Sequence, residues 1–195
     1  MIKWVEISSQ SDPIRNDILS KFLNDNGVEN TVDYLQVTSA QLKQAILDCQ
    51  KKYDQIRIHP NFGVESLGLF EGVTSEMLTI GAADCWMKAD GSWWPRSYYY
   101  KAFHSVIARQ GSKLNLDSEV LIIGTGALAK IFMNGFVKLG FKKINISSIM
   151  DESAQQFVQS SARFLFDVEL SFIPQALLIL SYFLSTTRIS RKFHF

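Results

Sequence analysis

Hydrophobic positions in the first third of the chain change repeatedly between the spacing of a helix and the spacing of a strand. Helical spacing begins at Pro13, which suits a first helical turn, and ends before Gly27, a typical stop residue. Alternating apolar residues predict strands over 31–37 and 55–58, and Ser39 is the expected cap of a helix between them. Helices and strands that alternate in this way predict an α/β fold.

Each of these two predicted helices carries its apolar residues on one side. The first has a stripe made of Ile14, Ile18, Leu19, Phe22 and Leu23. The second is expected to bury Leu42, Ala45, Ile46 and Cys49. Cys49 is therefore predicted to be a buried free thiol. Because Cys85 lies far from it, without metal-type spacing, no metal site is expected.

A turn dipeptide in the middle of the chain predicts a β-hairpin. Asp90-Gly91 is suited to a tight turn, and the segments on either side have the composition of strands. A helix is predicted over 98–109, and the bridge that follows leads into a second half with a different organisation. We place the domain division in this bridge, which gives domains of residues 1–112 and 113–195.

The second half has the pattern of a βαβαβ unit. Its apolar runs and amphipathic stretches predict strand 119–123, helix 126–139, strand 143–148, helix 152–163 and strand 166–172. A complete dinucleotide-binding fold needs a second such unit, and residues 173–195 are too few to form one. We therefore expect the chain to be truncated in its C-terminal part. The apolar segment 175–185 is shorter than the roughly 20 residues of a membrane helix, so no membrane span is expected.

The junction between the first strand and helix of this unit contains a glycine-rich turn, Gly124-Thr-Gly126. In a strand–turn–helix context, Gly124 would permit the tight turn and Gly126 the close approach of a pyrophosphate to the backbone. Ala129 would let the helix lie against the strand, and the first helical N–H groups, beginning at Ala127, would face the phosphates. These four residues are the predicted cofactor site. The alternative is an ordinary βα turn without a ligand.

Composition and charge narrow the choice of partners. With 195 residues, of which 47% are apolar and 20% charged, the chain is predicted to be globular. A net charge of +1 provides no electrostatic attraction to nucleic acid or to an anionic membrane. The first residues lack the apolar run of a secretory signal, so a reducing cytoplasm is the expected location. The dense aromatic residues between Trp86 and Phe103 are interpreted as packing residues and not as a base-stacking platform.

Three motifs, taken in order, resemble those of the shikimate dehydrogenase family. They are Ser9-Gln-Ser11 ahead of Pro13, Ile80-Gly-Ala-Ala-Asp-Cys85 ahead of the hairpin, and the turn Gly124-Thr-Gly-Ala-Leu-Ala129. The resemblance extends from about residue 7 to residue 170. It implies an N-terminal α/β substrate-binding domain followed by a Rossmann-type dinucleotide-binding domain, which is incomplete in this chain.

The same resemblance implies a function. The family transfers a hydride between NADP or NAD and a small hydroxy acid or keto acid of the shikimate type, in aromatic amino acid biosynthesis. It implies that Ser9, Ser11 and Asp84 contact the substrate. The expected partner is therefore a small molecule, and a homo-oligomer is left open.

The residues that differ from the family pattern are those closest to the chemistry. The lysine of the family corresponds to Asn61, its aspartate to Tyr99, and its asparagine to Asp84. His59 is a second candidate for acid–base work, because an unperturbed histidine pKa of roughly 6.5 suits a general base. His59, Asn61 and Tyr99 are therefore the catalytic candidates. Two hypotheses follow: an oxidoreductase, or a non-catalytic binding or vestigial protein that retains the fold.

The choice between NAD and NADP stays open. About 20 residues after the glycine-rich turn, where an acid would hold the ribose of NAD, the chain has Ser147-Ser-Ile-Met150. This segment has neither an acid nor an arginine for a 2′-phosphate. Asp151 follows it and serves either to reach a ribose or as the N-cap of the next helix.

Overall fold

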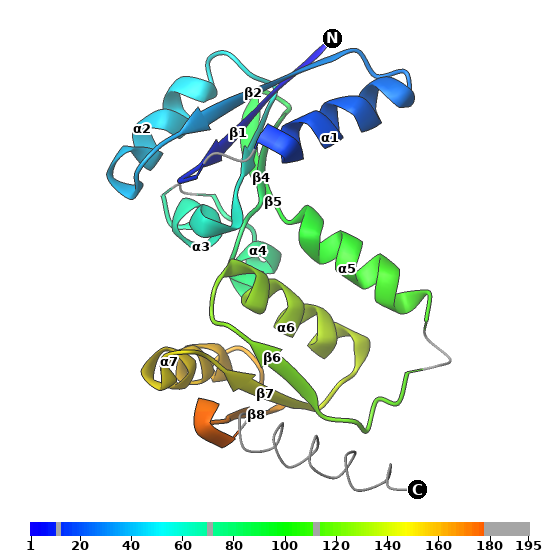
Figure 1. The fold of residues 1–195 in the computed structure, drawn as a ribbon, viewed down its shortest axis with the longest axis vertical. Helices are drawn as coiled ribbons and strands as arrows, with labels where there is room; N and C mark the ends of the chain where they lie inside the picture. Colours follow the sequence, from blue (N-terminus) through cyan, green and yellow to red (C-terminus); the bar gives the residue numbers. More distant parts are fainter. Residues whose placement is uncertain (11–12, 70–71, 111–113, 178–195) are drawn as a thin grey trace, which may run out of the picture. The chain divides into compact units, whose positions relative to one another are not determined.

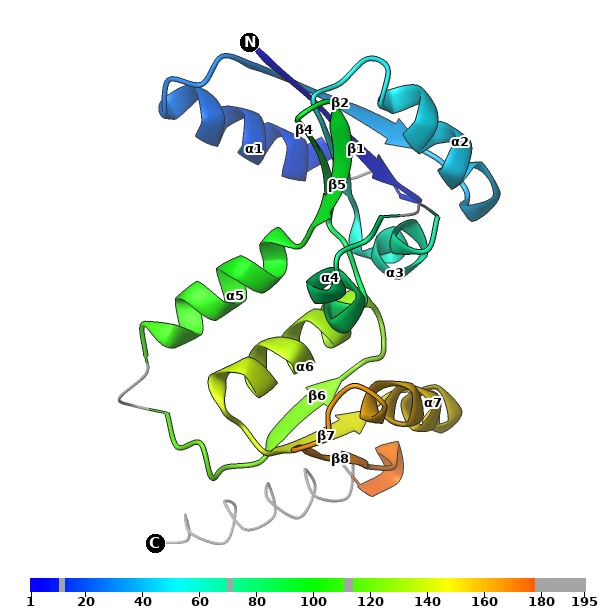
Figure 2. The same cartoon turned by 180° about the vertical axis from the view of Figure 1, so that it is seen from behind.

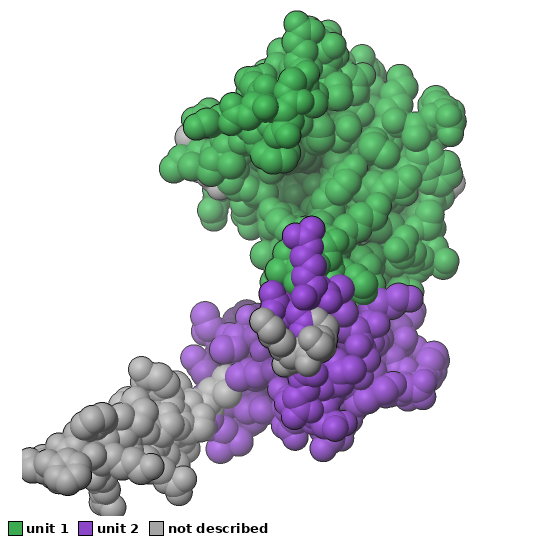
Figure 3. Space-filling view, turned by 90° about the vertical axis from the view of Figure 1, so that its right-hand side faces the viewer, with its two compact units in different colours: residues 1–106, 126–134 green, residues 107–125, 135–195 purple. Residues whose placement is uncertain are grey.

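The computed structural model describes residues 1–10, 13–69, 72–110 and 114–177. Its contacts divide the chain into two compact units (Figure 3). Unit 1 comprises Met1–Val106 and Gly126–Asn134, and unit 2 comprises Ile107–Thr125 and the residues from Gly135 onward. The domain division at residues 112 and 113 stays a prediction, since the contacts place a later segment, Gly126–Asn134, with unit 1.

Unit 1 is built on a five-stranded mixed sheet with the strand order β2-β1-β3-β4-β5 (Figure 1). Strands β1 and β2, and β1 and β3, are parallel, while β4 is antiparallel to both β3 and β5. The strands are β1 (Ile2–Ser8), β2 (Asn30–Gln36), β3 (Gln55–Ile58), β4 (Cys85–Ala89) and β5 (Ser92–Arg96). The helices are α1 (Pro13–Asp25), α2 (Ser39–Cys49), α3 (Gly63–Leu67), α4 (Ser75–Ile80) and α5 (Tyr98–Ala108), with a 3₁₀ turn over Pro60–Phe62.

Helix α2 covers one face of this sheet and buries the largest apolar cluster. Leu42, Ile46 and Cys49 of α2 are buried as predicted, Ala45 is partly buried, and both cysteines are buried free thiols. The strand residues of the cluster are Val5, Ile7, Ile56, Ile58 and Trp86. Ser39, the expected cap, is the first residue of the helix, so the N-cap lies one residue earlier. Thr38 occupies the N-cap position and its N–H donates to Gln41 Oε1 at 3.0 Å.

Helices α1 and α5 lie on the other face of the sheet (Figures 1 and 2). The apolar stripe of α1 does not pack against the sheet over its full width. Ile14, Ile18 and Phe22 are 67%, 64% and 63% exposed, while Asn16 of the same helix is buried. The side chains that this sheet face presents include Glu6 and Arg57, which are register partners on β1 and β3. This face of unit 1 is therefore polar at its centre, in contrast to the face under α2.

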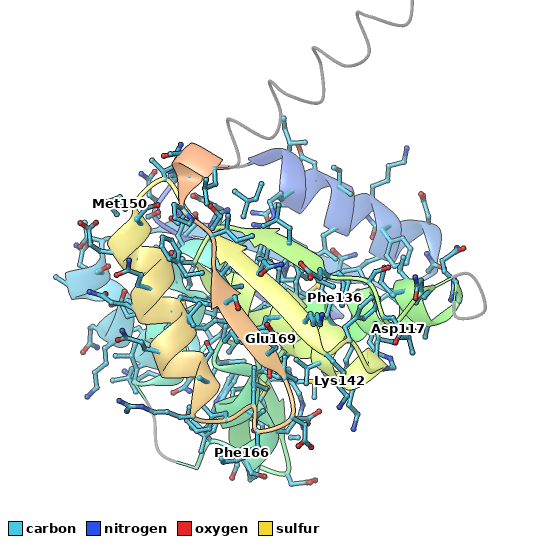
Figure 4. The ribbon with its side chains drawn as sticks, turned by 90° about the horizontal axis from the view of Figure 1, so that it is seen from below. Asp117, Phe136, Lys142, Met150, Phe166 and Glu169 are labelled. Carbon is cyan, nitrogen blue, oxygen red and sulfur yellow. The ribbon has the colours of Figure 1, made fainter. Side chains whose placement is uncertain are left out.

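The second half of the chain has the predicted βαβαβ arrangement, although the residues of its first helix up to Asn134 belong to unit 1. Strands β6 (Val120–Ile123), β7 (Lys143–Ser147) and β8 (Glu169–Phe172) form a parallel sheet in that order. Helix α6 (Ala127–Leu139) connects β6 to β7, and α7 (Asp151–Ala162) connects β7 to β8. Figure 4 shows this sheet from below, with Glu169 on β8 and Phe166 in the loop that precedes it. Ile144, Ile146, Ala154 and Phe157 are buried.

Strand β6 lies at the edge of this sheet. Among the described residues it pairs only with β7, and its alternate side chains Leu121 and Ile123 are 45% and 72% exposed. The predictions for the C-terminal segment beyond residue 177 lie outside the described residues. Within the described part of the chain, no helix is long and apolar enough to cross a membrane.

Candidate functional site

The first candidate site lies where two parallel strands end side by side. Strands β1 and β3 are neighbours, so the residues that follow them, Ser9 and His59, meet at the same edge of the sheet. Asn61 Nδ2 donates a hydrogen bond to Ser9 Oγ at 2.6 Å. His59 caps the short 3₁₀ turn that begins at Pro60, and its Nδ1 accepts from the Asn61 N–H at 3.3 Å. The fold thus brings Ser9, His59 and Asn61 together.

This cluster offers hydrogen bonding more readily than proton transfer. A serine hydroxyl and a neutral amide can both bind a carboxylate or a hydroxyl group, but neither titrates near neutral pH. Because Nδ1 of His59 accepts a hydrogen bond, the neutral ring carries its proton on Nε2. His59 could therefore donate a proton from Nε2, but it could accept one only at Nδ1, after Nδ1 releases the hydrogen bond from the Asn61 N–H. Ser11, the other serine of the predicted motif, lies outside the described residues.

Asp84 and Tyr99 have partners other than this cluster. The Asp84 carboxylate accepts from the backbone N–H groups of Tyr98 and Tyr99 at 2.8 and 2.7 Å, and from Ser97 Oγ at 3.3 Å. It therefore satisfies the N-terminal amides of α5, where the helix dipole favours a negative charge. The Tyr99 hydroxyl accepts from Arg15 Nη2 at 2.6 Å. This geometry explains Asp84 as a helix-capping residue without reference to a substrate.

Burial raises the pKa of the Asp84 carboxyl above its ordinary value of 3.8, although hydrogen bonds from Tyr99, Tyr98 and Ser97 oppose the shift. An acid with a raised native pKa stabilises the fold most below pH 3.8, and this contribution is lost as the pH rises through the native pKa. Asp84→Asn removes this titration. We therefore expect the free energy of unfolding of wild type, minus that of Asp84→Asn, to decrease as the pH rises from below 3.8. Urea titrations at a series of pH values measure this difference, and a constant difference would contradict the assignment.

The glycine-rich turn between β6 and α6 has the local geometry expected of a phosphate site. Gly124 has a φ of +122°, in the region that favours glycine, and its N–H donates to the Ser147 carbonyl at 2.8 Å. Gly126 precedes the helix and its carbonyl accepts from the Lys130 N–H. A Cβ added at Gly126 would meet no atom within 4 Å, so the space beside this residue is open. The first N–H groups of α6 have no acceptor within the helix and are suited to bind phosphate oxygens.

The alanines of this turn have packing roles. Ala127 and Ala129 are buried, and Ala127 belongs to an apolar cluster with Leu67, Ala83 and Ile131 in unit 1. Their methyl groups therefore face protein, and only their backbone is suited to a cofactor.

Asp151 is the first residue of α7, after the N-cap Met150, and its Oδ1 accepts from the Gln175 N–H at 3.2 Å. The interpretation of Asp151 as the N-cap was therefore wrong: Met150 is the N-cap, and Asp151 is the next residue.

Burial lowers the pKa of Lys130, which lies in the second turn of α6. Its side chain lies close to Gly81 at the end of α4. A Cβ added to Gly81 would be 3.5 Å from Lys130 Nζ. The carbonyl end of a helix favours a positive charge, which explains this lysine structurally.

Within the described ranges, no group of three or more His, Cys, Asp or Glu residues could hold a metal ion.

No protein-family model and no curated protein matches this sequence. Solved structures do match. The shikimate 5-dehydrogenase of Thermus thermophilus, in complex with shikimate, has a TM-score of 0.72 and 12% identity over 89% of this chain. The quinate dehydrogenase of Corynebacterium glutamicum, in complex with NAD, has a TM-score of 0.75 and 15% identity over 89%. The shikimate dehydrogenase of Mycobacterium tuberculosis has a TM-score of 0.68 and 13% identity over 90%.

The alignment covers 64% of the length of each of these three proteins, so this chain spans less than two thirds of them. At 12–15% identity the likeness concerns the fold and not the chemistry. It confirms the resemblance and the fold class that the motifs predicted. The chain has the fold of the shikimate and quinate dehydrogenases: a mixed α/β sheet domain followed by part of a Rossmann-type domain.

Proposed function

We propose that this chain belongs to an NAD(P)-dependent oxidoreductase of the shikimate dehydrogenase type, acting in the cytoplasm on a small hydroxy acid or keto acid. Its cofactor phosphates would bind at the turn from Gly124 to Ala129, and its substrate at the strand ends that carry Ser9 and Asn61. The open space beside Gly126 is the observation that carries the proposal, because that space is what a pyrophosphate at the backbone requires. The fold shared with dehydrogenases that bind NAD or shikimate supports it.

The residues of the chain would have limited roles in this reaction. Oxidation of a hydroxy acid transfers a hydride to the nicotinamide, releases the hydroxyl proton and leaves a keto acid. The Ser9 hydroxyl and the Asn61 amide would orient the substrate through hydrogen bonds. The proton acceptor would be His59 at Nδ1, which would have to release the hydrogen bond that it accepts from the Asn61 N–H. A positioned acid–base group typically contributes about 10²–10⁴-fold to a rate, so a poorly placed one leaves a slow enzyme.

The second hypothesis, a binding protein that does not catalyse, is favoured by the partners of Asn61 and Tyr99. The Asn61 amide lies at 2.6 Å from Ser9 Oγ, and the Tyr99 hydroxyl accepts from Arg15. Neither group is a base at neutral pH. A protein with these two residues would retain substrate and nucleotide binding without appreciable turnover.

The experiment that tests the cofactor site compares wild type with Gly126→Val in thermal unfolding. The variant should fold normally, because a Cβ at Gly126 meets nothing within 4 Å and the residue has no positive φ. NADP⁺ or NAD⁺ at 100 times its Kd should stabilise the wild type by about 2.7 kcal/mol. The branched side chain should remove this stabilisation. Equal shifts in the two proteins would contradict the proposed cofactor site.

Turnover separates the two functional hypotheses. With saturating shikimate and NADP⁺, formation of reduced nicotinamide should be slow in wild type and should fall further in His59→Ala. Nucleotide binding without any turnover would support the binding-protein hypothesis. Turnover that is unchanged in His59→Ala would exclude His59 as the proton acceptor.

A further inference from the structure

Gly63 lies at a point where three segments of unit 1 meet. It follows the 3₁₀ turn Pro60–Phe62, begins α3 and is buried. An added Cβ would lie 2.8 Å from the Ala127 Cβ and 3.0 Å from the Ala83 carbonyl oxygen. Ala127 is the first residue of α6, and the start of that helix, Gly126–Asn134, belongs to unit 1 together with Gly63. Because the φ of Gly63 is −59°, close packing and not backbone conformation explains a glycine here.

Hydrogen bonds tie the backbone of Gly63 to the turn that carries Asn61. The Gly63 N–H donates to the Pro60 carbonyl, and the Gly63 carbonyl accepts from the Ala83 N–H at 2.9 Å. Asn61, two residues before Gly63, donates from Nδ2 to Ser9 Oγ. A displacement of Gly63 would therefore move the turn that forms the strand-end cluster.

The other side of this contact belongs to the predicted phosphate site. Ala127 follows Gly126 directly, and the N–H groups of the first turn of α6 are the expected phosphate donors. The methyl group of Ala127 is buried in the cluster that contains Leu67 and Ala83. Close-packed interiors transmit small displacements from one neighbour to the next. One van der Waals contact, at Gly63, therefore joins the predicted phosphate site to the substrate turn.

We propose that Gly63 is a positioning residue, which couples nucleotide binding at the start of α6 to the order of the turn Pro60–Phe62. A dinucleotide whose pyrophosphate accepts from the first N–H groups of α6 would hold Ala127 against Gly63. The turn would then open less often, because its opening requires Gly63 to move. This inference rests on the nucleotide site of the proposed function, and it applies whether or not the protein catalyses a reaction.

Hydrogen exchange of the full chain, measured by NMR with and without nucleotide, tests this coupling. The probe is whichever of NAD⁺ and NADP⁺ raises the melting temperature more. The amides of Phe62 and Gly63 report the opening of the turn, because they donate to the carbonyls of His59 and Pro60. At about 100 times the Kd, both amides should exchange at least about threefold more slowly.

An amide at the end of α2 provides the internal control. The Gln50 N–H donates to the Ile46 carbonyl at 2.9 Å and lies outside the contact between Gly63 and α6. Its exchange should not change when the nucleotide binds. Equal slowing of this amide and of the two turn amides would indicate general stabilisation of unit 1 and would contradict the coupling.

An exchange of one methyl group across the contact tests whether Gly63 carries the coupling. Gly63→Ala forces the two segments apart, so the bound nucleotide should no longer slow the turn amides. Ala127→Gly deletes the methyl group that faces Gly63 and should have the same effect, which keeps the test independent of the folding of Gly63→Ala. The double variant Gly63→Ala/Ala127→Gly places one methyl group on the opposite side, removes the 2.8 Å contact and should restore at least half of the slowing.

Gly68→Ala is the matched control, because the nearest atom to a Cβ there is 3.7 Å away, and it should retain the full slowing. Slowing that is equal in wild type and Gly63→Ala, or a double variant without recovery, would overturn the inference. Nucleotide binding without any slowing in wild type would overturn the inference alone. If neither nucleotide changes the melting temperature, both the proposed cofactor site and the inference are wrong.

Discussion

Replacement of Arg57 by methionine is expected to lower the free energy of unfolding by about 3–5 kcal/mol, because the change breaks a buried ion pair from one side. Glu6 is fully buried, and Arg57 Nη1 lies 3.1 Å from one of its oxygens. Without Arg57, that oxygen loses the guanidinium beside it, while Arg15 still contacts the other at 2.9 Å. Urea unfolding at neutral pH, followed by tryptophan fluorescence, measures the loss.

The physical cause is tested by a second substitution. Glu6→Gln in the Arg57→Met background removes the stranded charge, so the double variant should be more stable than Arg57→Met. Lys51→Met is the matched control, because it breaks a pair with Asp48 in which both side chains are at least half exposed. That change should cost about 0–1 kcal/mol. A double variant less stable than Arg57→Met would show that the cost comes from lost packing.

Gly63→Ala is expected to destabilise unit 1 by about 1–3 kcal/mol through overpacking. A Cβ at Gly63 would lie 2.8 Å from the Ala127 Cβ and 3.0 Å from the Ala83 carbonyl oxygen. Neither neighbour is the end of a flexible side chain, so relief requires a shift of the backbone. Thermal or urea unfolding of the variant gives the cost directly.

Gly68→Ala is the matched control for this substitution. Gly63 and Gly68 both have right-handed helical backbone angles, with φ of −59° and −79°, so alanine fits both conformations. At Gly68 the nearest atom to an added Cβ is 3.7 Å away, which is an ordinary contact. Gly68→Ala should therefore be neutral or stabilise by up to about 1 kcal/mol. Equal effects at the two glycines would mean that α6 does not approach Gly63 so closely.

Elements with strong local signals could be predicted from the sequence. The Asp90-Gly91 hairpin is one, since both residues have positive φ, as a tight hairpin turn requires. Gly27 and Gly140 also have positive φ and follow the ends of α1 and α6, as their positions predicted. The order of strands and helices from β6 to β8 was predicted because the hydrophobic period changes clearly between them.

Strand β1 was not predicted. Apolar Val5 and Ile7 alternate with polar Glu6 and Ser8 at its end, yet all four residues are buried. Glu6 in particular is typical of a solvent-exposed position. It is buried because Arg15 and Arg57 meet it from α1 and β3, and these partners are far from it in sequence. The short helices α3 and α4 likewise lack enough turns for a helical period to be recognised.

Some features of the candidate site depend on local sequence, and others depend on the tertiary structure. Local sequence determined the strand–turn–helix unit at Gly124, the cap at His59 and the hairpin, because each depends on the backbone preferences of adjacent residues. Tertiary structure decided which side chains meet. Parallel pairing of β1 with β3 joins Ser9 to Asn61, while the start of α5 takes the carboxylate of Asp84, and Arg15 takes the Tyr99 hydroxyl. These contacts join residues up to 84 positions apart, and only the packed fold brings such residues within hydrogen-bonding distance.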